Sequence, residues 1–418
     1  MAHDRAQKID EPSVLARVIE AAYNCTHDPL DSQAASGQAR GIGVAAVNIL
    51  LLEPYYAGSH AAWAAGYAAH SQHQVTTLSL PGRFWKWRMH GGAVSLARRF
   101  MSMATVPDLI LATDMLDLTT FLALTRSRTH SLPTALYFHE NQLSYPWSVT
   151  DRDVRQGRDT HYGFINYASA LAADALFFNS RYHLESFLAE LPRLLKHFPD
   201  HQELDTLEIL YAKSAVLPVG LDLRRFDDLR PSPHSPTHSR PLILWNHRWE
   251  HDKNPAEFFR ALYVLAERGV DFGLIILGER FRRQPTEFIE ARQRLADRVC
   301  QFGYISDFPT YARWLWQADL LPVTSHHDFF GVSVVEAIYC HCFPLLPRRL
   351  SYPELVPPRY HDLCFYHNFD DLVGRLEVAV RNLDQTRQIS LREAVAHLDW
   401  SQVSPVYDHR LAAVAARR

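Results

Sequence analysis

The sequence predicts an α/β protein built from two doubly wound domains. Short, nearly continuous apolar runs alternate with segments of helix length along most of the chain. Such runs are typical of parallel strands that helices cover on both faces. The alternation occurs twice, on either side of a break rich in Pro and Ser at residues 230–241. A chain of 418 residues is long enough for two domains, each with its own core.

Six apolar runs form the expected strands of each sheet. In the first half they cover residues 47–54, 75–82, 108–115, 134–141, 175–180 and 214–220. In the second half they cover residues 241–247, 272–279, 299–305, 318–325, 343–349 and 363–368. We therefore expect a first domain at 47–229, an extended linker at 230–241 and a second domain at 242–399.

The two ends of the chain fall outside this pattern. Residues 1–46 hold one amphipathic stretch at 13–23 and then a Gln-, Ala-, Gly- and Ser-rich segment, which predicts a partly flexible extension. Residues 400–418 predict a terminal helix whose position the sequence does not indicate.

Composition excludes several classes of protein. The formal net charge of −3 provides no global attraction for nucleic acid. The five cysteines are odd in number and contain no CxxC pair, so they indicate free thiols rather than a disulfide framework or a zinc site. No apolar run is long enough to span a bilayer, and residues 1–20 lack the apolar core of a signal peptide. We expect a soluble cytoplasmic protein with no membrane partner.

Polar residues at strand ends are the candidates for chemistry, because open α/β sheets bind ligands at the carboxyl ends of their strands. Gly58, Ser59 and His60 follow the first strand and would form the turn into a helix, a site suited to an anion. The alternative is a plain tight turn in which Ser59 caps the helix. The turn is not GxGxxG, which argues against a dinucleotide site.

Three adjacent polar residues, His139, Glu140 and Asn141, follow the fourth strand and would emerge together at the cleft between the domains. A satisfied structural histidine is the alternative reading of His139. Asn179 and Ser180 follow the fifth strand, where a role as a helix cap is equally plausible.

The second half opens with a sharper pattern. Arg248 and Lys253 follow its first strand and together could neutralise a diphosphate, whereas an ordinary solvated loop is the alternative. Further along, Asp328 precedes a turn at Gly331 and a helix that carries Glu336. The amides at the start of that helix suit a phosphate or sugar oxygen, and Glu336 could accept hydrogen bonds from a ribose diol or merely complement the helix dipole.

Two patterns, one of acids and one of histidines, match metal-binding motifs, and we interpret both matches as chance. Asp151 and Asp153 match the DxD pattern of metal-dependent sugar transferases, but they lie in a polar stretch rather than at a strand end. The adjacent His326 and His327 would point apart, so we expect no metal there.

A local basic and aromatic segment stands out at residues 81–99, which contain five Arg or Lys and no acid. Trp85 and Trp87 alternate there with Lys86 and Arg88. Basic charge beside flat aromatic rings favours contact with RNA, and a segment that packs on its own domain is the alternative.

Together these residues resemble the retaining GT-B glycosyltransferases of family 4. Arg248 and Lys253 match the pair that binds the donor diphosphate, Glu336 matches the second acid of the E-x7-E motif, and Gly331 matches the glycine of that loop. One departure is that Asp328 stands where the wider family has Glu. Residues 1–46 have no counterpart in the resemblance.

Five longer segments resemble a narrower group, the tRNA-queuosine α-mannosyltransferases. They are ILLLEPYYAGSH, LPGRFWKWRMHG, LYFHENQLSYP, DTHYGFINYASALAADALFFNSRYH and HHDFFGVSVVEA. The resemblance implies a GT-B fold and the retaining transfer of mannose from GDP-mannose to queuosine in the anticodon of aspartate tRNA. It implies that no metal or other cofactor is required.

The resemblance also assigns roles to residues. The catalytic residues it implies are His139, Arg248, Lys253 and Asp328. The donor-binding residues it implies are Gly58, Ser59, Arg248, Lys253, Phe330, Gly331, Val332 and Glu336. Contact with tRNA is expected at His60, Trp85, Lys86, Trp87, Arg88, Glu140 and Asn141. Two alternatives stay open, a glycosyltransferase that acts on a lipid or small metabolite and a non-catalytic RNA-binding protein on the same scaffold.

Overall fold

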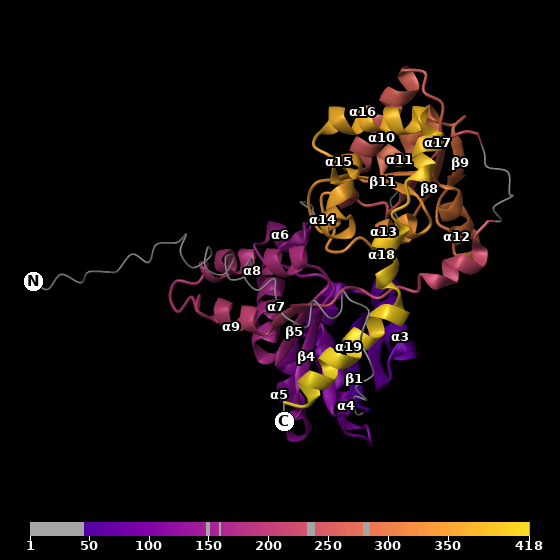
Figure 1. Ribbon diagram of the computed structural model, residues 1–418. Helices are drawn as coiled ribbons and strands as arrows, with labels where there is room; N and C mark the ends of the chain where they lie inside the picture. The colour runs from indigo at the N-terminus through magenta and orange to yellow at the C-terminus, as the bar shows by residue number, and fades with distance from the viewer. Residues whose placement is uncertain (1–45, 148–150, 159, 232–238, 279–284, 418) are drawn as a thin grey trace, which may run out of the picture.

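The computed structural model describes residues 46–147, 151–158, 160–231, 239–278 and 285–417, which form two lobes (Figure 1). Each lobe contains a parallel sheet, and this confirms the two doubly wound domains predicted from the alternation of strands and helices. Almost all of the predicted extension and the centre of the predicted linker lie outside the described residues.

The first sheet has the strand order β2-β1-β3-β4-β5-β6, and all its described pairings are parallel. Its strands are β1 (Asn48–Tyr56), β2 (Gln74–Pro81), β3 (Leu109–Thr113), β4 (Thr134–Phe138), β5 (Ala175–Phe178) and β6 (Ser214–Val216). The helices that accompany it are α3 (Gly58–His70), α4 (Trp85–Met101), α5 (Leu118–Thr129), α6 (Arg152–Arg155), α7 (Thr160–Ala172), α8 (Arg181–Leu195) and α9 (Thr206–Ala212).

The second sheet has the order β12-β11-β10-β7-β8-β9 and is likewise parallel among the described strands. Its strands are β7 (Leu242–Asn246), β8 (Gly273–Leu277), β9 (Val299–Phe302), β10 (Leu320–Pro322), β11 (Phe343–Pro347) and β12 (Phe365–Tyr366). Its helices are α10 (Pro255–Glu267), α11 (Thr286–Arg294), α12 (Phe308–Gln317), α13 (Val332–Tyr339), α14 (Tyr352–Leu355), α15 (His361–Cys364), α16 (Phe369–Arg381), α17 (Leu383–Gln388) and α18 (Arg392–Val395).

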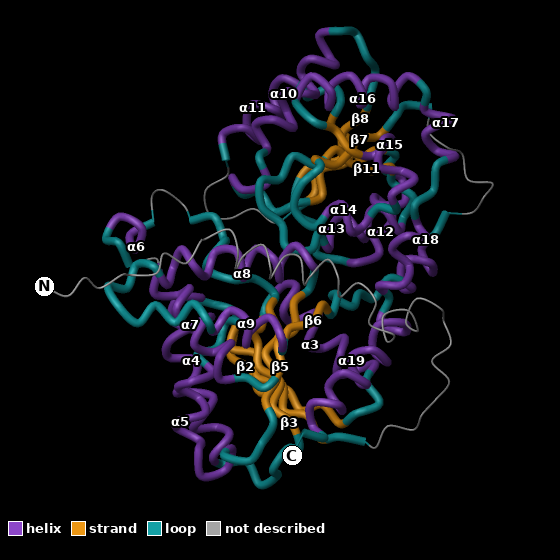
Figure 2. The backbone as a smooth tube through the Cα atoms, turned by 60° about the vertical axis from the view of Figure 1, so that its left-hand side comes forward, coloured by secondary structure: helices purple, strands orange, loops and turns teal. Residues whose placement is uncertain are grey.

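Helices cover both faces of the sheets, as the tube in Figure 2 shows. In β1 the side chains of Ile49 and Leu51 enter one hydrophobic cluster, and those of Leu50 and Leu52 enter another on the opposite face. A strand buried on both faces needs apolar residues at consecutive positions, which explains the uninterrupted runs in the sequence. Among the described helices, none has both the length and the hydrophobicity that crossing a bilayer requires.

The terminal helix α19 (Trp400–Ala415) returns to the first lobe and lies beside α3 and β4 (Figure 1). A short parallel bridge between Leu221 and Asp399 brings the chain back at the point where the lobes join. Trp400 then packs directly on Gly66 and Gly220, where a Cβ would lie 2.1 Å and 2.4 Å from the indole. The last helix therefore belongs structurally to the first domain although it follows the second in sequence.

The carboxyl ends of both sets of strands meet at the junction of the lobes. Ser180, which follows β5, donates a hydrogen bond of 2.6 Å from Oγ to the carbonyl of Phe329, which lies in the loop after β10. Glu354 of the second lobe accepts hydrogen bonds from the backbone amides of Arg181 and Tyr182 at the start of α8. The residues that follow the strands of the two sheets therefore share one region.

Candidate active site

The donor half of the site is built on the loop after β7. Lys253 ends the short 3-10 helix η2 (His251–Lys253) and is only 8% exposed. Its Nζ donates to the carbonyl of His327 at 2.7 Å and lies 3.3 Å from Asp252 and 3.6 Å from Asp328. Burying an ammonium group is costly unless opposite charges and hydrogen bonds surround it, and this arrangement supplies both.

Arg248 lies on the same loop but in a different setting. Its side chain is 49% exposed and pairs with Glu250 at 3.2 Å. The neighbouring Trp245 and Trp249 are core residues, with Trp249 stacked on Phe288 at 4.2 Å. The tryptophans thus anchor the loop, and the guanidinium of Arg248 is half exposed, whereas Lys253 is buried.

Asp328 carries its charge in the folded protein. Burial alone would raise the pKa of this carboxyl, but the ammonium of Lys253, together with His247 and His327, lowers it below its ordinary value. The hydroxyl of Tyr352 donates to Oδ2 at 3.3 Å. Because these partners fix the short side chain, its place beside Lys253 is well defined.

Helix α13 supplies the rest of the donor half. Gly331 is its N-cap and has φ of 96°, in the left-handed region that favours glycine, so the loop can deliver the first amides of the helix to the site. Phe330 and Val332 flank this glycine in the chain. Glu336 is half-buried one turn further on and accepts a hydrogen bond of 2.6 Å from the hydroxyl of Tyr311. Burial raises the pKa of Glu336 despite that hydrogen bond.

In the first lobe, three residues from different strand ends form a compact group. Glu53 of β1 is fully buried, and its Oε2 lies 3.2 Å from Nδ1 of His60 in the first turn of α3. The ring of His60 lies against that of His139, which follows β4, with centroids 4.2 Å apart. Trp63 and Tyr137 pack edge-on against His139 at 4.6 Å and 4.8 Å.

The two histidines of this group have opposite charge states. Burial would lower the pKa of His60, but Glu53, with smaller contributions from Asp114 and Glu140, raises it to about 9. Burial lowers the pKa of His139 well below its ordinary value, and the charge of His60 lowers it further. At neutral pH the site therefore holds one imidazolium and one neutral imidazole.

The turn before α3 differs in detail from the sequence expectation. Gly58 has φ of 51° and begins the helix, and both Gly58 and Ser59 are exposed. The N-cap is Ala57, which has no side-chain hydrogen bond, so the alternative role of Ser59 as a cap is wrong. The exposed amides of this turn remain suited to an anion.

Asn141 and Glu140 have internal partners. Oδ1 of Asn141 accepts hydrogen bonds from the amides of Leu143 and Ser144, which closes the loop after β4, while Oε1 of Glu140 accepts one from Gln142. Ser180 caps α8 by accepting a hydrogen bond from the amide of His183. Its capping role is therefore real, and its bond to Phe329 adds a second role across the junction.

The basic aromatic segment is mostly helix α4, and its residues divide into two kinds. Trp85 is half-buried against Trp147 and Tyr162. Lys86 donates hydrogen bonds of 2.6 Å to Asp151 and 2.5 Å to Asp153. The two aspartates therefore neutralise this lysine, a pairing that the sequence did not predict.

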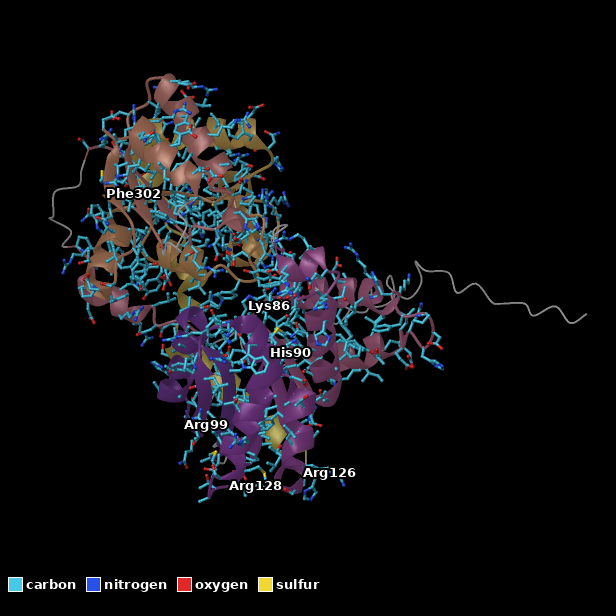
Figure 3. The ribbon with its side chains drawn as sticks, turned by 180° about the vertical axis from the view of Figure 1, so that it is seen from behind. Lys86, His90, Arg99, Arg126, Arg128 and Phe302 are labelled. Atoms are coloured by element: carbon cyan, nitrogen blue, oxygen red, sulfur yellow. The ribbon has the colours of Figure 1, made fainter. Side chains whose placement is uncertain are left out.

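Trp87 is 62% exposed, and the guanidinium of Arg88 donates to the carbonyl of Pro81 at the surface. Figure 3 places Lys86 and His90 near the junction of the lobes, whereas Arg99, Arg126 and Arg128 lie at the far end of the first lobe. Arg128 donates to the carbonyls of Phe100, Met103 and Thr105, so it serves to close the end of α4.

One group of described residues has the composition of a metal site, because donor atoms of Glu53, His60 and His139 all lie within 4.8 Å of one another. The contact between Glu53 and His60 accounts for two of these groups as an ion pair. Asp151 and Asp153, which match the DxD pattern, both form ion pairs with Lys86.

Buried polar atoms that make no hydrogen bond to another described residue gather at the strand ends. Among the described residues they are Asp114 Oδ2, His139 Nε2, Asn141 Nδ2, His183 Nε2, His247 Nε2, Asp252 Oδ2, Ser325 Oγ, His327 Nε2 and His341 Nε2. All except His341 follow a strand of one sheet or the other at its carboxyl end. Buried polar groups are nearly always hydrogen-bonded, so this concentration indicates a region adapted to a polar ligand.

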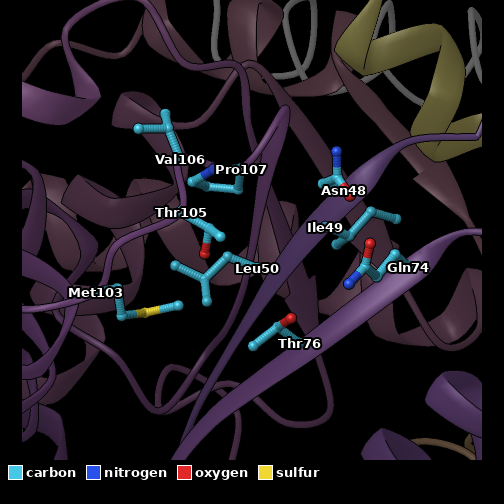
Figure 4. Close-up of a pocket in the computed structure, with 9 residues that line it drawn as sticks. All are labelled: Asn48, Ile49, Leu50, Gln74, Thr76, Met103, Thr105, Val106 and Pro107. Atoms are coloured by element: carbon cyan, nitrogen blue, oxygen red, sulfur yellow. The ribbon is translucent and has the colours of Figure 1, made fainter.

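A separate depression of about 220 Å³ lies at the opposite edge of the first sheet (Figure 4). Asn48, Gln74 and Pro107 line it, at or before the amino ends of β1, β2 and β3. It contains none of the candidate residues, and ligands of open α/β sheets bind at the other edge.

Comparison with known proteins agrees with this division of the chain. Residues 48–221 match the family described as tRNA-queuosine alpha-mannosyltransferase N-terminal, and residues 229–390 match the glycosyl transferases group 1. The tRNA-queuosine alpha-mannosyltransferase of Drosophila melanogaster is 34% identical over 317 residues, which cover 74% of this chain and 82% of that protein. The chain belongs to the tRNA-queuosine alpha-mannosyltransferase family. This membership confirms the family resemblance seen in the sequence segments.

Proteins of lower sequence identity match part of this chain or share its fold. A GDP-mannose-dependent alpha-(1-6)-phosphatidylinositol dimannoside mannosyltransferase of Mycobacterium tuberculosis is 26% identical over 147 residues, covering 34% of this chain and 38% of that protein. Among solved structures, sucrose-phosphate synthase from Thermosynechococcus elongatus has a TM-score of 0.64 at 13% identity and covers 89% of this chain and all of that one. Anabaena HepE has a TM-score of 0.60 at 15% identity, covering 88% of this chain and 99% of that one. The two-domain GT-B fold of this family member is thereby confirmed.

Two residues of the site were not among the candidates chosen from the sequence. Asp114 follows β3 at the sheet edge that the other candidates share, so the rule that selected His139 also applies to it. Tyr311 lies within α12, and its contact with Glu336 depends on how that helix packs, for which the sequence of this family member has no signal.

Proposed function

We propose that the protein transfers mannose from GDP-mannose to queuosine in the anticodon of aspartate tRNA, with retention at the anomeric carbon. The observation that carries the proposal is the match to tRNA-queuosine alpha-mannosyltransferase over most of both chains. GDP-mannose is α-linked, so an α-mannoside product corresponds to retention.

The donor half supports this chemistry in electrostatic terms. Departure of the diphosphate creates negative charge, and the buried Lys253, with the half-exposed Arg248, would stabilise it in the transition state. The first amides of α13 would add hydrogen bonds to the same groups. Glu336 would accept hydrogen bonds from the ribose hydroxyls. Lys253, Arg248 and the amides of α13 can stabilise the departing diphosphate with no metal ion.

The first lobe would receive the transferred sugar and the acceptor. His139, neutral and partly unpartnered, would contact the mannose from across the junction. In front-face attack the departing phosphate oxygen takes the proton of the acceptor hydroxyl, so no dedicated protein base is needed. Exposed Trp87 and Arg88 would contact the RNA outside the cleft. An RNA acceptor of this kind is met in the cytoplasm, which we propose as the protein's location.

The test uses the purified full chain and tRNA prepared with or without queuosine. Each RNA is incubated separately with radiolabelled GDP-mannose, GDP-fucose, UDP-glucose and UDP-galactose, and the digested nucleosides are analysed by mass spectrometry. We expect one hexose on queuosine, from GDP-mannose alone, that α-mannosidase removes. Transfer to RNA lacking queuosine, or from another donor in preference, would contradict the proposal, as would transfer only to added phosphatidylinositol mannosides.

A further inference from the structure

The Glu53–His60 pair occupies a place that the proposed reaction does not use directly. His60 was expected to touch the acceptor, but it is only 8% exposed and faces inward. Its Nδ1 is 3.2 Å from Glu53, and its ring covers one side of His139. The residue is therefore placed to act on His139 rather than on the RNA.

His139 is fixed on its remaining sides. Its backbone amide donates to Oδ1 of Asp114 at 2.8 Å, and its carbonyl accepts from Asn179 at 2.9 Å. Trp63 and Tyr137 meet the ring edge-on. Its Nε2 is buried and has no partner among the described protein groups. The contact with His60 brings a positive charge directly against the ring.

We propose that the buried Glu53–His60 ion pair is a positioning element that holds the ring of His139 neutral and correctly oriented against the transferred mannose. The inference rests on the proposed function. As the diphosphate leaves, the sugar ring gains positive charge, and an imidazolium at His139 would oppose it. A neutral imidazole can instead direct a nitrogen lone pair toward the positively charged sugar ring.

The charges around the pair explain why an ion pair is needed. The groups that face the two histidines are Glu53 from β1, Asp114 after β3, Glu140 after β4 and His183 from α8. Without the positive charge of His60, a charge that lowers the pKa of His139 would be lost, and the carboxylate of Glu53, within 4.8 Å of His139, would be left to favour its protonation. The imidazolium of His60 offsets that carboxylate, while Glu53 keeps His60 charged.

The variants test charge separately from shape. In His60→Gln the cation is lost, and we expect the acidic limb of the kcat–pH profile to move up by about one unit, because the pKa of His139 rises. In the double variant Glu53→Gln/His60→Gln the net charge of the pair is zero again, so the limb should return toward its wild-type position. A purely structural role predicts that the double variant is worse than either single one, with no shift of the limb in any of them.

A second measurement, the titration of the two histidines, does not depend on catalytic activity. Histidines of the full chain are labelled with ¹³C, and the signals of His60 and His139 are assigned from His60→Gln and His139→Gln. We expect His60 to stay protonated up to about pH 8, consistent with its pKa of about 9, and His139 to stay neutral at a pH where an ordinary histidine is already protonated.

The outcomes separate the two proposals. A wild-type chain that transfers no mannose contradicts the proposed function, whereas the histidine titration still tests the ion pair. An active chain whose acidic limb is unmoved in His60→Gln overturns the inference. A stoichiometric metal ion in the purified chain that His139→Gln removes would overturn it as well.

Discussion

At the scale of single residues, the site is a set of buried ionisable groups whose charges are set by their neighbours. Asp328 stays ionised because the ammonium of Lys253 lies beside it, and His60 stays protonated because of Glu53. By contrast, burial lowers the pKa of both His247 and His327 to about 4, with Lys253 contributing to each. With both histidines neutral, Lys253 is the positive charge that lies beside Asp328.

These histidines predict how stability depends on pH. The unfolded chain protonates histidine near pH 6.5, but folded His247 and His327 resist protonation until about pH 4. The unfolded state therefore binds more protons in this window, and the free energy of unfolding falls as the pH drops from 6.5 to 4. Urea midpoints at pH 7 and pH 5 measure the effect.

The double variant His247→Gln/His327→Gln isolates this contribution. Asp114 and Glu336 have a raised pKa and act in the opposite direction, but they are present in both proteins. We expect the variant to lose less stability than the wild type between pH 7 and pH 5. An equal loss in both proteins would show that the two histidines are not buried in the neutral form.

At the scale of elements, α4 combines a structural and a binding role. Its first turn is tied to α6 because Lys86 bonds to Asp151 and Asp153, and the ammonium also lies 5.1 Å from the ring of Trp147. Trp87, one residue later, covers Gly91 and is open to solvent. Adjacent residues of the predicted RNA patch thus have different functions.

This difference can be measured with tRNA. Arg88→Ala should weaken binding and reduce the slope of log K against log salt by about one phosphate contact. Trp87→Ala should weaken binding by about 1–3 kcal/mol through lost stacking, with little change of slope. Lys86→Met should leave the slope unchanged, because two carboxylates already neutralise its charge. A reduced slope for Lys86→Met would show that this lysine leaves its aspartates to bind RNA.

The sequence predicted elements better than side-chain partners. The apolar runs located both sheets because burial on two faces leaves a clear record in consecutive residues such as Ile49–Leu52. The strand ends located Lys253 and His139 because topology brings such ends together. The pairing of Lys86 with the aspartates was missed, since their contact joins residues 65 and 67 positions apart and no local pattern records it.

At the scale of the whole molecule, α19 crosses from the second lobe to the first and closes one face of the first sheet. The hydroxyl of Tyr407 accepts a hydrogen bond from Trp63 and donates to the carbonyl of Pro218, and Trp63 packs on His139. The last helix therefore supports the same histidine that the proposed reaction uses, which its position in the sequence did not indicate.

Trp400 is the test of this arrangement. It is 2% exposed, so Trp400→Ala should lower the free energy of unfolding by about 3–5 kcal/mol through the cavity it leaves. Val406→Ala on the exposed side of the same helix is the matched control, with an expected change within about 0.5 kcal/mol. Chemical denaturation of the full chains compares them, and equal midpoints would mean that Trp400 does not anchor α19 on the first lobe.

The central claim is that the strand ends of the two lobes form one active site, with Lys253 stabilising the leaving diphosphate. The most direct test is the rate of mannose transfer from GDP-mannose to queuosine-containing tRNA by Lys253→Ala, beside the wild type and the exposed control Lys196→Ala. The account predicts a loss of about 10²–10³-fold in kcat for Lys253→Ala in a chain that remains folded, and wild-type turnover for the control. Near-normal transfer by a folded Lys253→Ala would contradict the account.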